Sequence, residues 1–386
     1  MKDFVDSLRR DVVFLILAAT CLAWAIAAPS RVLDYPKLVD WPTILALAGL
    51  LILTRGVEVS GALSVLARRL ILAIHTERKL ALFLVGASAL LSTFLTNDVA
   101  LFVLVPLTLR LRGSSSSRGS LPRGSLPQAS PARGEVPVLR LIVFEAIAVN
   151  AGSALTPLGN PQNLFLWGQS GVKFVSFMST MLPVVAIAMV ALLLLTVLAF
   201  SNRRLDADDE PVPAVDRRLL IVSLLLYAPF LVLIDTHHPT IACVTVLAIF
   251  ALLARRVLAG VDWALLAVFV LMFIDLRLAA QTEVVRHAIE AIGVQEPMRL
   301  FATAVLASQL ISNVPAAILL TEYSKDWVTI AYGVTVGGFG IFIGSLANLI
   351  AMRLAKDRRA WLVFHAYSVP FVFVVGLVTW AWLAWR

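Results

Sequence analysis

Long apolar runs separated by short polar stretches dominate this sequence. With proline, glycine and charge taken as breaks, the runs predict nine membrane crossings. They are 12–28, 41–54, 139–168, 176–200, 219–234, 239–254, 263–276, 329–352 and 361–384. A helix crosses a bilayer in about 20 apolar residues, whereas a transmembrane strand needs about 9–11 alternating positions, and such alternation is missing here. The pattern predicts an all-α polytopic membrane protein.

Composition agrees with this class. Of the 386 residues, 60% are hydrophobic and 15% charged, against about 45–50% and 25% in soluble domains. In a soluble protein, the net charge of +8 would suggest binding to nucleic acid. In a membrane protein, Lys and Arg collect on the cytoplasmic side, so the charge reflects topology. We therefore expect contact with membrane lipid and no binding of nucleic acid. Cys21 and Cys243 lie in apolar runs, which excludes a disulfide framework or a CxxC site. We expect no metal, no bound cofactor and no enzymatic activity, since Walker A and nucleophile-elbow motifs are missing.

Two apolar stretches carry polar motifs in their centres and are predicted to be re-entrant hairpins. With them, 24 of the 32 Lys and Arg residues fall on one side, which the positive-inside rule makes cytoplasmic. We therefore expect a cytoplasmic (inner) membrane protein with its N-terminus inside. The predicted organisation is 1–79, first-repeat scaffold and an interfacial helix; 80–111, inner hairpin; 112–138, disordered cytoplasmic loop; 139–200, first broken helix and last helix; 201–297, linker helix and second-repeat scaffold; 298–322, outer hairpin; 323–386, second broken helix and last helix.

The chain also repeats itself. Residues 39–55 align with 261–277 through Val-Asp-Trp, an Ile and a final Arg, 90–100 align with 306–316, and 159–164 align with 344–349. In the predicted topology the copies have opposite orientations. Inverted repeats are typical of secondary transporters, whose substrate site lies near mid-membrane where discontinuous helices of the two repeats meet.

The polar interruptions fall at matching positions of both repeats. Unpaired N–H groups at half-helix starts favour anions, and carbonyl and amide oxygens favour cations. Helix capping is the alternative role for the tip residues. The predicted substrate-binding residues are Thr96, Asn97, Thr156, Gly159, Asn160, Asn163, Ser312, Asn313, Gly344, Ser345 and Asn348.

Three acidic residues lie within apolar stretches, where a charge costs about 2.5–3.5 kcal/mol on insertion scales. Asp98, beside the first tip, is predicted to bind the coupling proton or cation. Glu145 is the second coupling-ion candidate, with a pair to a polar neighbour as its alternative. For Asp275 we expect an ion pair with Arg277.

Three segments in this order, FLTNDVALFVLVPL (94–107), NAGSALTPLGNPQNLFLW (150–167) and SQLISNVPAAILL (308–320), resemble the ion transporter superfamily. That superfamily includes citrate and dicarboxylate symporters, arsenite efflux permeases and D-type sodium/proton antiporters. The resemblance implies an elevator mechanism, a scaffold that forms a homodimer, and hairpin tips that bind substrate and cation. Sodium-coupled dicarboxylate members carry Ser-Asn-Thr at both tips, whereas this chain has Thr-Asn-Asp and Ser-Asn-Val.

The function predicted from these features is secondary transport of a small organic or inorganic anion, of the citrate/dicarboxylate or oxyanion class. The transported coupling ion, H⁺ or Na⁺, takes the place of a cofactor. Two alternatives stay open: a sodium/proton antiporter, and an arsenite efflux permease partnered by a soluble ATPase.

Overall fold

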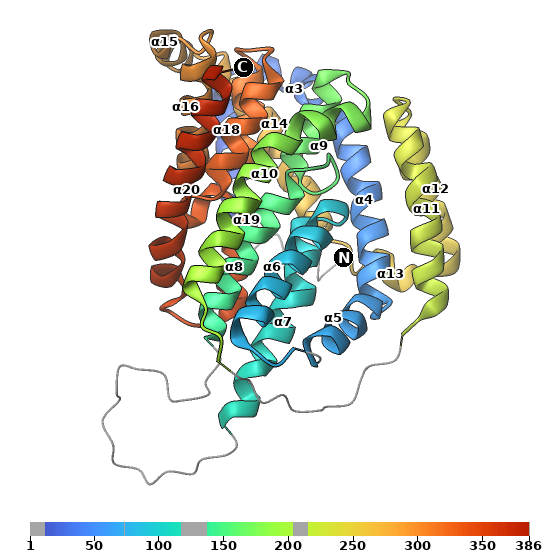
Figure 1. Cartoon of the computed structure of the whole chain (residues 1–386). Helices are drawn as coiled ribbons and strands as arrows, with labels where there is room; N and C mark the ends of the chain where they lie inside the picture. Colours follow the sequence, from blue (N-terminus) through green and yellow to red (C-terminus); the bar gives the residue numbers. More distant parts are fainter. Residues whose placement is uncertain (1–11, 73, 117–136, 204–214, 386) are drawn as a thin grey trace.

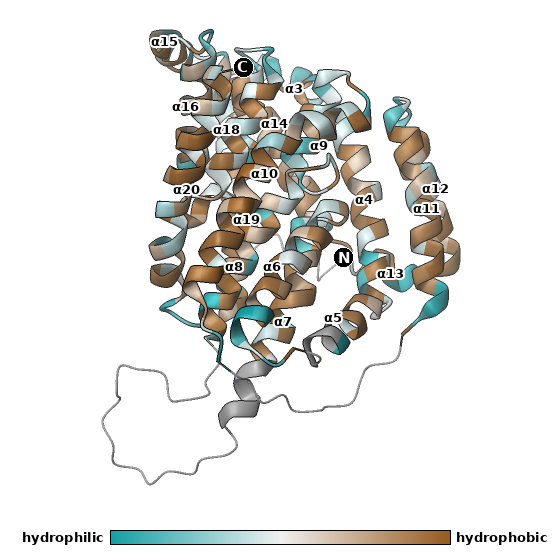
Figure 2. Cartoon of the chain, viewed as in Figure 1, coloured by the Kyte–Doolittle hydropathy of each residue, from teal (hydrophilic) through white to brown (hydrophobic). Residues whose placement is uncertain are grey.

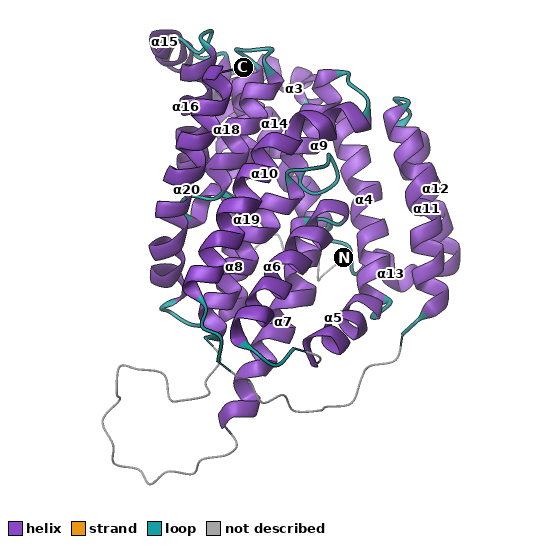
Figure 3. Ribbon diagram, in the orientation of Figure 1, coloured by secondary structure: helices purple, strands orange, loops and turns teal. Residues whose placement is uncertain are grey.

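The computed structural model describes residues 12–72, 74–116, 137–203 and 215–385, and every regular element in these ranges is helical (Figures 1 and 3). The first half contains α2 (Val12–Ala27), η1 (Pro29–Asp34), α3 (Tyr35–Leu38), α4 (Trp41–Val59), α5 (Ala62–Leu72), α6 (Glu77–Phe94), α7 (Asn97–Ser116), α8 (Val138–Ser153), α9 (Pro161–Ser170) and α10 (Phe174–Ala199). The second half contains α11 (Arg217–Asp235), α12 (Pro239–Leu253), α13 (Arg255–Ala259), α14 (Trp263–Ala280), α15 (Glu283–Ile292), α16 (Pro297–Ile311), α17 (Asn313–Thr321), α18 (Trp327–Gly338), η2 (Phe342–Gly344), α19 (Leu346–Ala355) and α20 (Ala360–Trp385). The all-α prediction is confirmed.

Each predicted crossing coincides with one helix or with an interrupted pair. Among the described residues, α4, α10, α11, α14 and α20 are long and apolar enough to cross a membrane, and α2 and α12 are shorter apolar helices. The runs 139–168 and 329–352 form the interrupted pairs α8/α9 and α18/α19. Hydrophobic residues cover the middle of the bundle, and hydrophilic residues gather towards its two ends (Figure 2). We call these the upper end, which holds α3 and α15, and the lower end, which holds α5 and α13 (Figure 1).

The helices pack as two groups, each drawn from both halves of the chain. In the scaffold group, defined as α2–α5 and α11–α15, α4 packs against α11 and α12, and α14 packs against α2. In the hairpin group, defined as α6–α10 and α16–α20, α6 packs against α8 and α16 against α18. The helical hairpins α6/α7 and α16/α17 both belong to the second group.

The repeated Val-Asp-Trp motif starts two matching helices. Asp40 and Asp262 cap α4 and α14 by accepting hydrogen bonds, 3.0 Å long, from the backbone N–H three residues ahead. The indole N–H groups of Trp41 and Trp263 donate over 2.9 Å to the backbone carbonyl five residues behind. The motif recurs because aspartate satisfies the unpaired N–H groups that every helix start exposes.

Arginines near the ends of α4 and α14 contact the start of the opposite helix. Arg277 Nη1 donates over 2.8 Å to the carbonyl of Leu38, just before α4. Arg55 packs against Gly260, just before α14, so closely that a Cβ at residue 260 would lie 2.8 Å from Arg55 Nε. The two helices are therefore antiparallel neighbours with matched ends, as an inverted repeat requires.

Three predicted segments extend beyond what the structure describes. Residues 1–11, 117–136 and 204–214 lie outside the described residues. The second of these ranges contains most of the predicted cytoplasmic loop 112–138. Helix α7 runs to Ser116, past the predicted hairpin end at residue 111.

Candidate functional site

The first hairpin turns between α6 and α7. Helix α6 ends at Phe94, Leu95 is extended, and α7 starts at Asn97. The backbone N–H of Asn97 donates over 3.1 Å to the carbonyl of Gly159, which joins the tip to the first interrupted pair. Thr96 and Asn97 are buried, and neither Thr96 Oγ1 nor Asn97 Oδ1 has a hydrogen-bond partner.

The interruption between α8 and α9 is held by amide side chains. Asn160 caps α9 by accepting a 2.9 Å hydrogen bond from the N–H of Asn163. Asn163 Nδ2 in turn donates to the carbonyls of Ala154 (2.8 Å) and Thr156 (3.3 Å). The break therefore has a defined shape because side-chain donors pair carbonyls that a continuous helix would have paired. Figure 3 shows this loop part-way along the bundle, beside α9.

Thr156 and Gly159 fix the interruption against the hairpin. Thr156 Oγ1 donates over 2.5 Å to the carbonyl of Thr93 on α6. A Cβ at Gly159 would lie 2.3 Å from the Ser153 carbonyl oxygen and 2.6 Å from that of Ser92. Only glycine allows backbone to approach so closely.

The second hairpin tip is a single strained residue. Ser312, between α16 and α17, has φ +74°, a conformation that costs a non-glycine residue free energy and is found preferentially at functional sites. Asn313 is buried, and its Oδ1 accepts a 2.9 Å hydrogen bond from the N–H of Val314. The tip oxygen that is free in the first hairpin is therefore paired in the second.

The interruption between α18 and α19 repeats the first. Ser345 caps α19 by accepting from the N–H of Ala347 (3.3 Å). Asn348 Nδ2 donates to the carbonyls of Gly338 (2.9 Å) and Ile341 (3.4 Å), the pattern made by Asn163. Gly344 ends η2, where a Cβ would lie 2.7 Å from the Gly337 carbonyl oxygen.

Asn150 links the two halves and was missed by the sequence analysis. From α8, its Nδ2 donates to Asn348 Oδ1 over 2.7 Å, and its Oδ1 accepts from Ser345 Oγ over 2.7 Å. The sequence signal that could have pointed to Asn150 is its amide side chain within the apolar run 139–168, which also contains the first interruption. Asn150 joins the candidate site as a residue that positions the second interruption.

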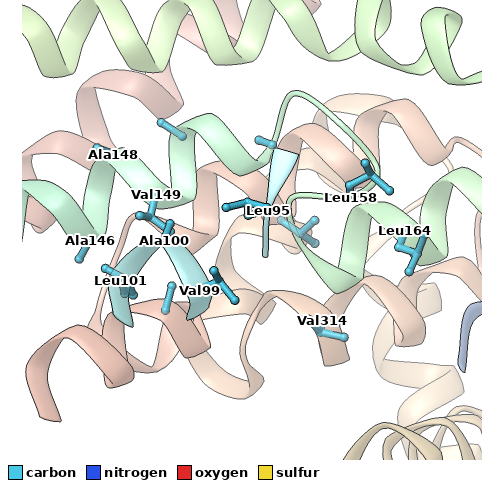
Figure 4. Packing of buried hydrophobic residues seen from close by; sticks show 14 of the residues in the cluster. Leu95, Val99, Ala100, Leu101, Ala146, Ala148, Val149, Leu158, Leu164 and Val314 are labelled. Atoms are coloured by element: carbon cyan, nitrogen blue, oxygen red, sulfur yellow. The ribbon is translucent and has the colours of Figure 1, made fainter. Parts of the chain in front are cut away.

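Four helices, α7, α9, α17 and α19, begin at these tips and breaks. Helix α7 packs against α19, and α17 packs against α9, so each neighbouring pair combines one helix from each half. Figure 4 shows the side chains of Leu95, Val99, Leu158 and Val314, from both tips and the first interruption, gathered in one buried region. The residues at the four helix starts are connected: Asn97 binds Gly159, Asn160 binds Ser153, and Ser345 binds Asn150. A Cβ at Gly338 would lie 3.3 Å from Asn313 Nδ2 and 3.9 Å from Asn150 Oδ1, which places the last helix start beside the others. The predicted residues of both repeats thus form one cluster with four helix N-termini around it.

The two predicted coupling-ion residues have different surroundings. Glu145 on α8 is fully buried and accepts a hydrogen bond from Thr108 Oγ1 on α7, while its Oε2 has no partner. Asp98, in the first turn of α7, is partly buried and within Coulombic range of the carboxylates of Glu58 and Asp262. Glu145 thus has the polar neighbour given as its alternative, and Asp98 faces the scaffold group.

The expected Asp275–Arg277 ion pair is wrong. Arg277 pairs with Glu322, Nε to Oε1 over 3.0 Å, and with the Leu38 carbonyl. Residues two apart on a helix do not face each other, so Arg277 turns to the upper end while Asp275 points into the bundle. Among the described residues there is no cluster of three or more His, Cys, Asp or Glu side chains that could hold a metal ion.

The chain has relatives along most of its length. A citrate transporter family model matches residues 4–327. The chain is 43% identical to the inner membrane protein YbiR of Escherichia coli K12, over 97% of this chain and 96% of that protein. It is 28% identical to the uncharacterized transporter MJ0456 of Methanocaldococcus jannaschii, over 90% and 91%.

A solved structure shares the fold. The YdaH transporter of Alcanivorax borkumensis superposes with a TM-score of 0.52 at 16% identity, over 97% of this chain and 90% of that one. The family is one of transporters, and the Methanocaldococcus relative is named a transporter. This confirms the resemblance seen in the motifs and the prediction that the chain is not an enzyme. The chain is a multi-pass membrane transporter and belongs to the citrate transporter family.

Proposed function

We propose that this protein is a secondary active transporter that moves a small organic or inorganic anion across the cytoplasmic membrane by an elevator mechanism, coupled to protons or sodium. The observation that carries the proposal is the cluster of four helix N-termini, α7 and α9 from one half and α17 and α19 from the other. Helix N-termini present unpaired N–H groups and partial positive charge, which favour an anion.

The side chains around the cluster suit a carboxylate or an oxyanion. Hydroxyl and amide groups of Thr96, Asn97, Ser312 and Asn313 lie at the tips, and they can donate to an anion without adding a fixed charge. Citrate, dicarboxylates and inorganic oxyanions present such acceptor oxygens. The substrate class that we propose is therefore a small citrate-like carboxylate or an oxyanion.

An asymmetry between the halves supports a coupling cation in the first half. Thr96 Oγ1, Asn97 Oδ1 and Asn163 Oδ1 are buried and unpartnered. Their counterparts in the second half are hydrogen-bonded, Asn348 Oδ1 to Asn150 among them. Buried oxygens without donors favour a cation, because an unsatisfied polar group costs about 1–3 kcal/mol. Sodium would use these oxygens, and a proton would use Asp98 or Glu145.

The packing supports movement of the hairpin group past the scaffold group. Four polar contacts that join the groups lie at the upper end: Gln169 to Asp40 (2.7 Å), the Phe174 N–H to Asp235 (2.7 Å), Arg277 to Glu322 (3.0 Å) and Tyr323 to the Ala280 carbonyl (2.5 Å). A rigid-body movement would exchange these contacts for others.

We propose that the scaffold group also forms a homodimer. The N-terminus is proposed to lie inside, and the Escherichia coli relative is named an inner membrane protein.

A thermal-stability screen of the purified protein tests the anion site. Citrate, succinate and arsenite are added separately, with and without sodium, at two pH values. An anion at 100 times its Kd stabilises the folded state by about 2.7 kcal/mol, and Asn97→Ala and Asn313→Ala should abolish that shift. Thr335→Val is the matched control, because the Thr335 hydroxyl is buried without a partner. Unchanged binding in both asparagine variants would contradict the site.

Uptake into proteoliposomes tests the coupling. A proton gradient should drive uptake of the stabilising anion, and Asp98→Asn should remove that dependence. Uptake that follows sodium and ignores protons would exclude proton coupling. Sodium/proton exchange without any anion uptake would replace the whole proposal with the antiporter.

A further inference from the structure

Asp275 is a buried carboxylic acid outside the candidate site. It lies on α14 of the scaffold group with 4% of its surface exposed. Neither carboxylate oxygen has a hydrogen-bond partner. An isolated ionised carboxylate in apolar surroundings is costly, so such a group is protonated, paired or functional.

The N-terminal helices supply two further titratable side chains beside α14. The Tyr35 side chain on α3 is buried, its hydroxyl has no partner, and it lies within Coulombic range of both Asp275 and the Cys21 thiol on α2. Both α2 and α3 pack against α14. The contact of α14 with the N-terminal helices thus contains two buried oxygen groups that are not hydrogen-bonded to each other.

Among the residues that the structure describes, no basic side chain pairs with Asp275. Arg277 is bound to Glu322 and Leu38, and Arg31, which is within range of Tyr35, donates to Gln281. On α3, Lys37 pairs with Asp34 (2.7 Å). Of the other helices packed on α14, α17 contains no charged residue and α4 has its Arg55–Glu58 pair at its lower end. The charged residues of α15 lie in a helix at the upper end. They are Glu283, Arg286, His287 and Glu290.

The repeat shows that packing alone does not require an acid here. When 39–55 is aligned with 261–277, the residue matching Asp275 is Leu53 on α4. Leu53 is fully buried, so an apolar side chain fills the equivalent position of the same kind of helix. The carboxyl group therefore adds chemistry that the fold does not need.

We propose that Asp275 is a proton-binding site between the N-terminal helices and α14, and that its proton keeps α2 and α3 packed against α14. Two carboxylate oxygens and one phenol oxygen are too few for a hard metal cation, which takes about six or more oxygen ligands. A proton needs only one acceptor, and the neutral acid then carries no charge into the buried contact. When Asp275 loses its proton to water, a carboxylate charge remains in the contact between α14 and the N-terminal helices. That charge draws water into the contact and weakens the packing.

Infrared spectroscopy of the full-length protein tests the protonation directly. The wild type should show the carbonyl stretch of a protonated carboxylic acid that Asp275→Asn removes. Glu145→Gln is the control, because it changes a different buried acid and should leave this band in place. A spectrum in which Asp275→Asn leaves every protonated-acid band unchanged overturns the proposal.

Thermal unfolding tests the consequence for α2 and α3. Asp275→Leu copies the residue of the matching position, and Asp275→Asn keeps the shape without the proton. As pH rises above the unfolded-state pKa of aspartate, about 3.9, unfolding releases the Asp275 proton. The wild type should therefore lose stability relative to both variants, by up to about tenfold in the unfolding equilibrium per pH unit, until Asp275 also ionises in the folded protein. Stability curves that run parallel in all three proteins from acid to alkaline pH overturn the proposed role of the proton.

Discussion

The amide of Asn150 in the first half donates a 2.7 Å hydrogen bond to the side-chain oxygen of Asn348 in the second half, while its own oxygen accepts from Ser345. All three side chains are buried. The two inverted halves thus share one closed set of hydrogen bonds at the place where their helices are interrupted.

Removing that amide should destabilise the protein. Asn150→Ala leaves the Asn348 oxygen and the Ser345 hydroxyl without their partner, and each unsatisfied buried group costs about 1–3 kcal/mol. Thermal unfolding in detergent measures the loss. The matched control is again Thr335→Val, which removes a buried hydroxyl that has no partner and should cost far less. Equal losses in the two variants would argue against the shared network.

Gly152 on α8 should not tolerate replacement by alanine, whereas Gly86 on α6 should. A Cβ at Gly152 would lie 2.1 Å from the carbonyl oxygen of Ala89, which is backbone and cannot yield. Gly152→Ala should therefore cost at least about 1–3 kcal/mol. Gly86 has nothing within 4 Å of its added Cβ, so Gly86→Ala should stabilise by about 0.5–1 kcal/mol through helix propensity. Unfolding curves of the two variants should thus move in opposite directions.

The Arg277–Glu322 ion pair should couple the two groups energetically. Its side chains are 18% and 32% exposed, so we expect a coupling energy of about 0.5–1 kcal/mol in a double-mutant cycle of Arg277→Ala and Glu322→Ala. Arg277→Ala alone should cost more than Glu322→Ala, because Arg277 also donates to Leu38. Additive single and double variants would show that the pair contributes nothing.

Acid should remove the contribution of Asp216, the N-cap of α11. The hydrogen bond from the Leu219 N–H, and then Arg256, hold the pKa of Asp216 below its ordinary value of 3.8. A lowered pKa stabilises the folded state above the unfolded pKa, and the effect is lost as pH falls through the folded value. Asp216→Asn keeps the cap but not the charge. The wild type should therefore melt higher at neutral pH, and the difference should vanish well below pH 3.8; a constant difference would contradict this.

Sequence reasoning reached the elements whose signal is local. Val-Asp-Trp is recognisable because capping by aspartate involves residues three positions apart, and the same holds for Asn160 with Asn163. The interruptions were predicted from proline, glycine and amides within apolar runs, and the structure places breaks there. These features depend on neighbours in the chain, which a sequence displays.

Contacts between distant residues were beyond that reasoning. Asn150 looks like any amide in an apolar run, and its role appears only when Asn348 lies beside it. The partner of Arg277 was wrong because sequence proximity suggested Asp275, whereas the helix turns the two side chains apart. The free and paired oxygens of the two tips also differ through packing, although Asn97 and Asn313 align in sequence.

The matched ends of α4 and α14 also bear on how the protein is made. Arg55 contacts Gly260, and the Leu38 carbonyl contacts Arg277, so each helix leaves the ribosome more than two hundred residues apart from its partner. A nascent chain that has just completed α10 holds an arginine and a carbonyl at α4 with their partners still untranslated. Domains generally fold as units during synthesis, yet this scaffold is completed only by its late segments. During most of translation, chaperones and the insertion machinery therefore act on a protein whose scaffold group still lacks the helices of the second half.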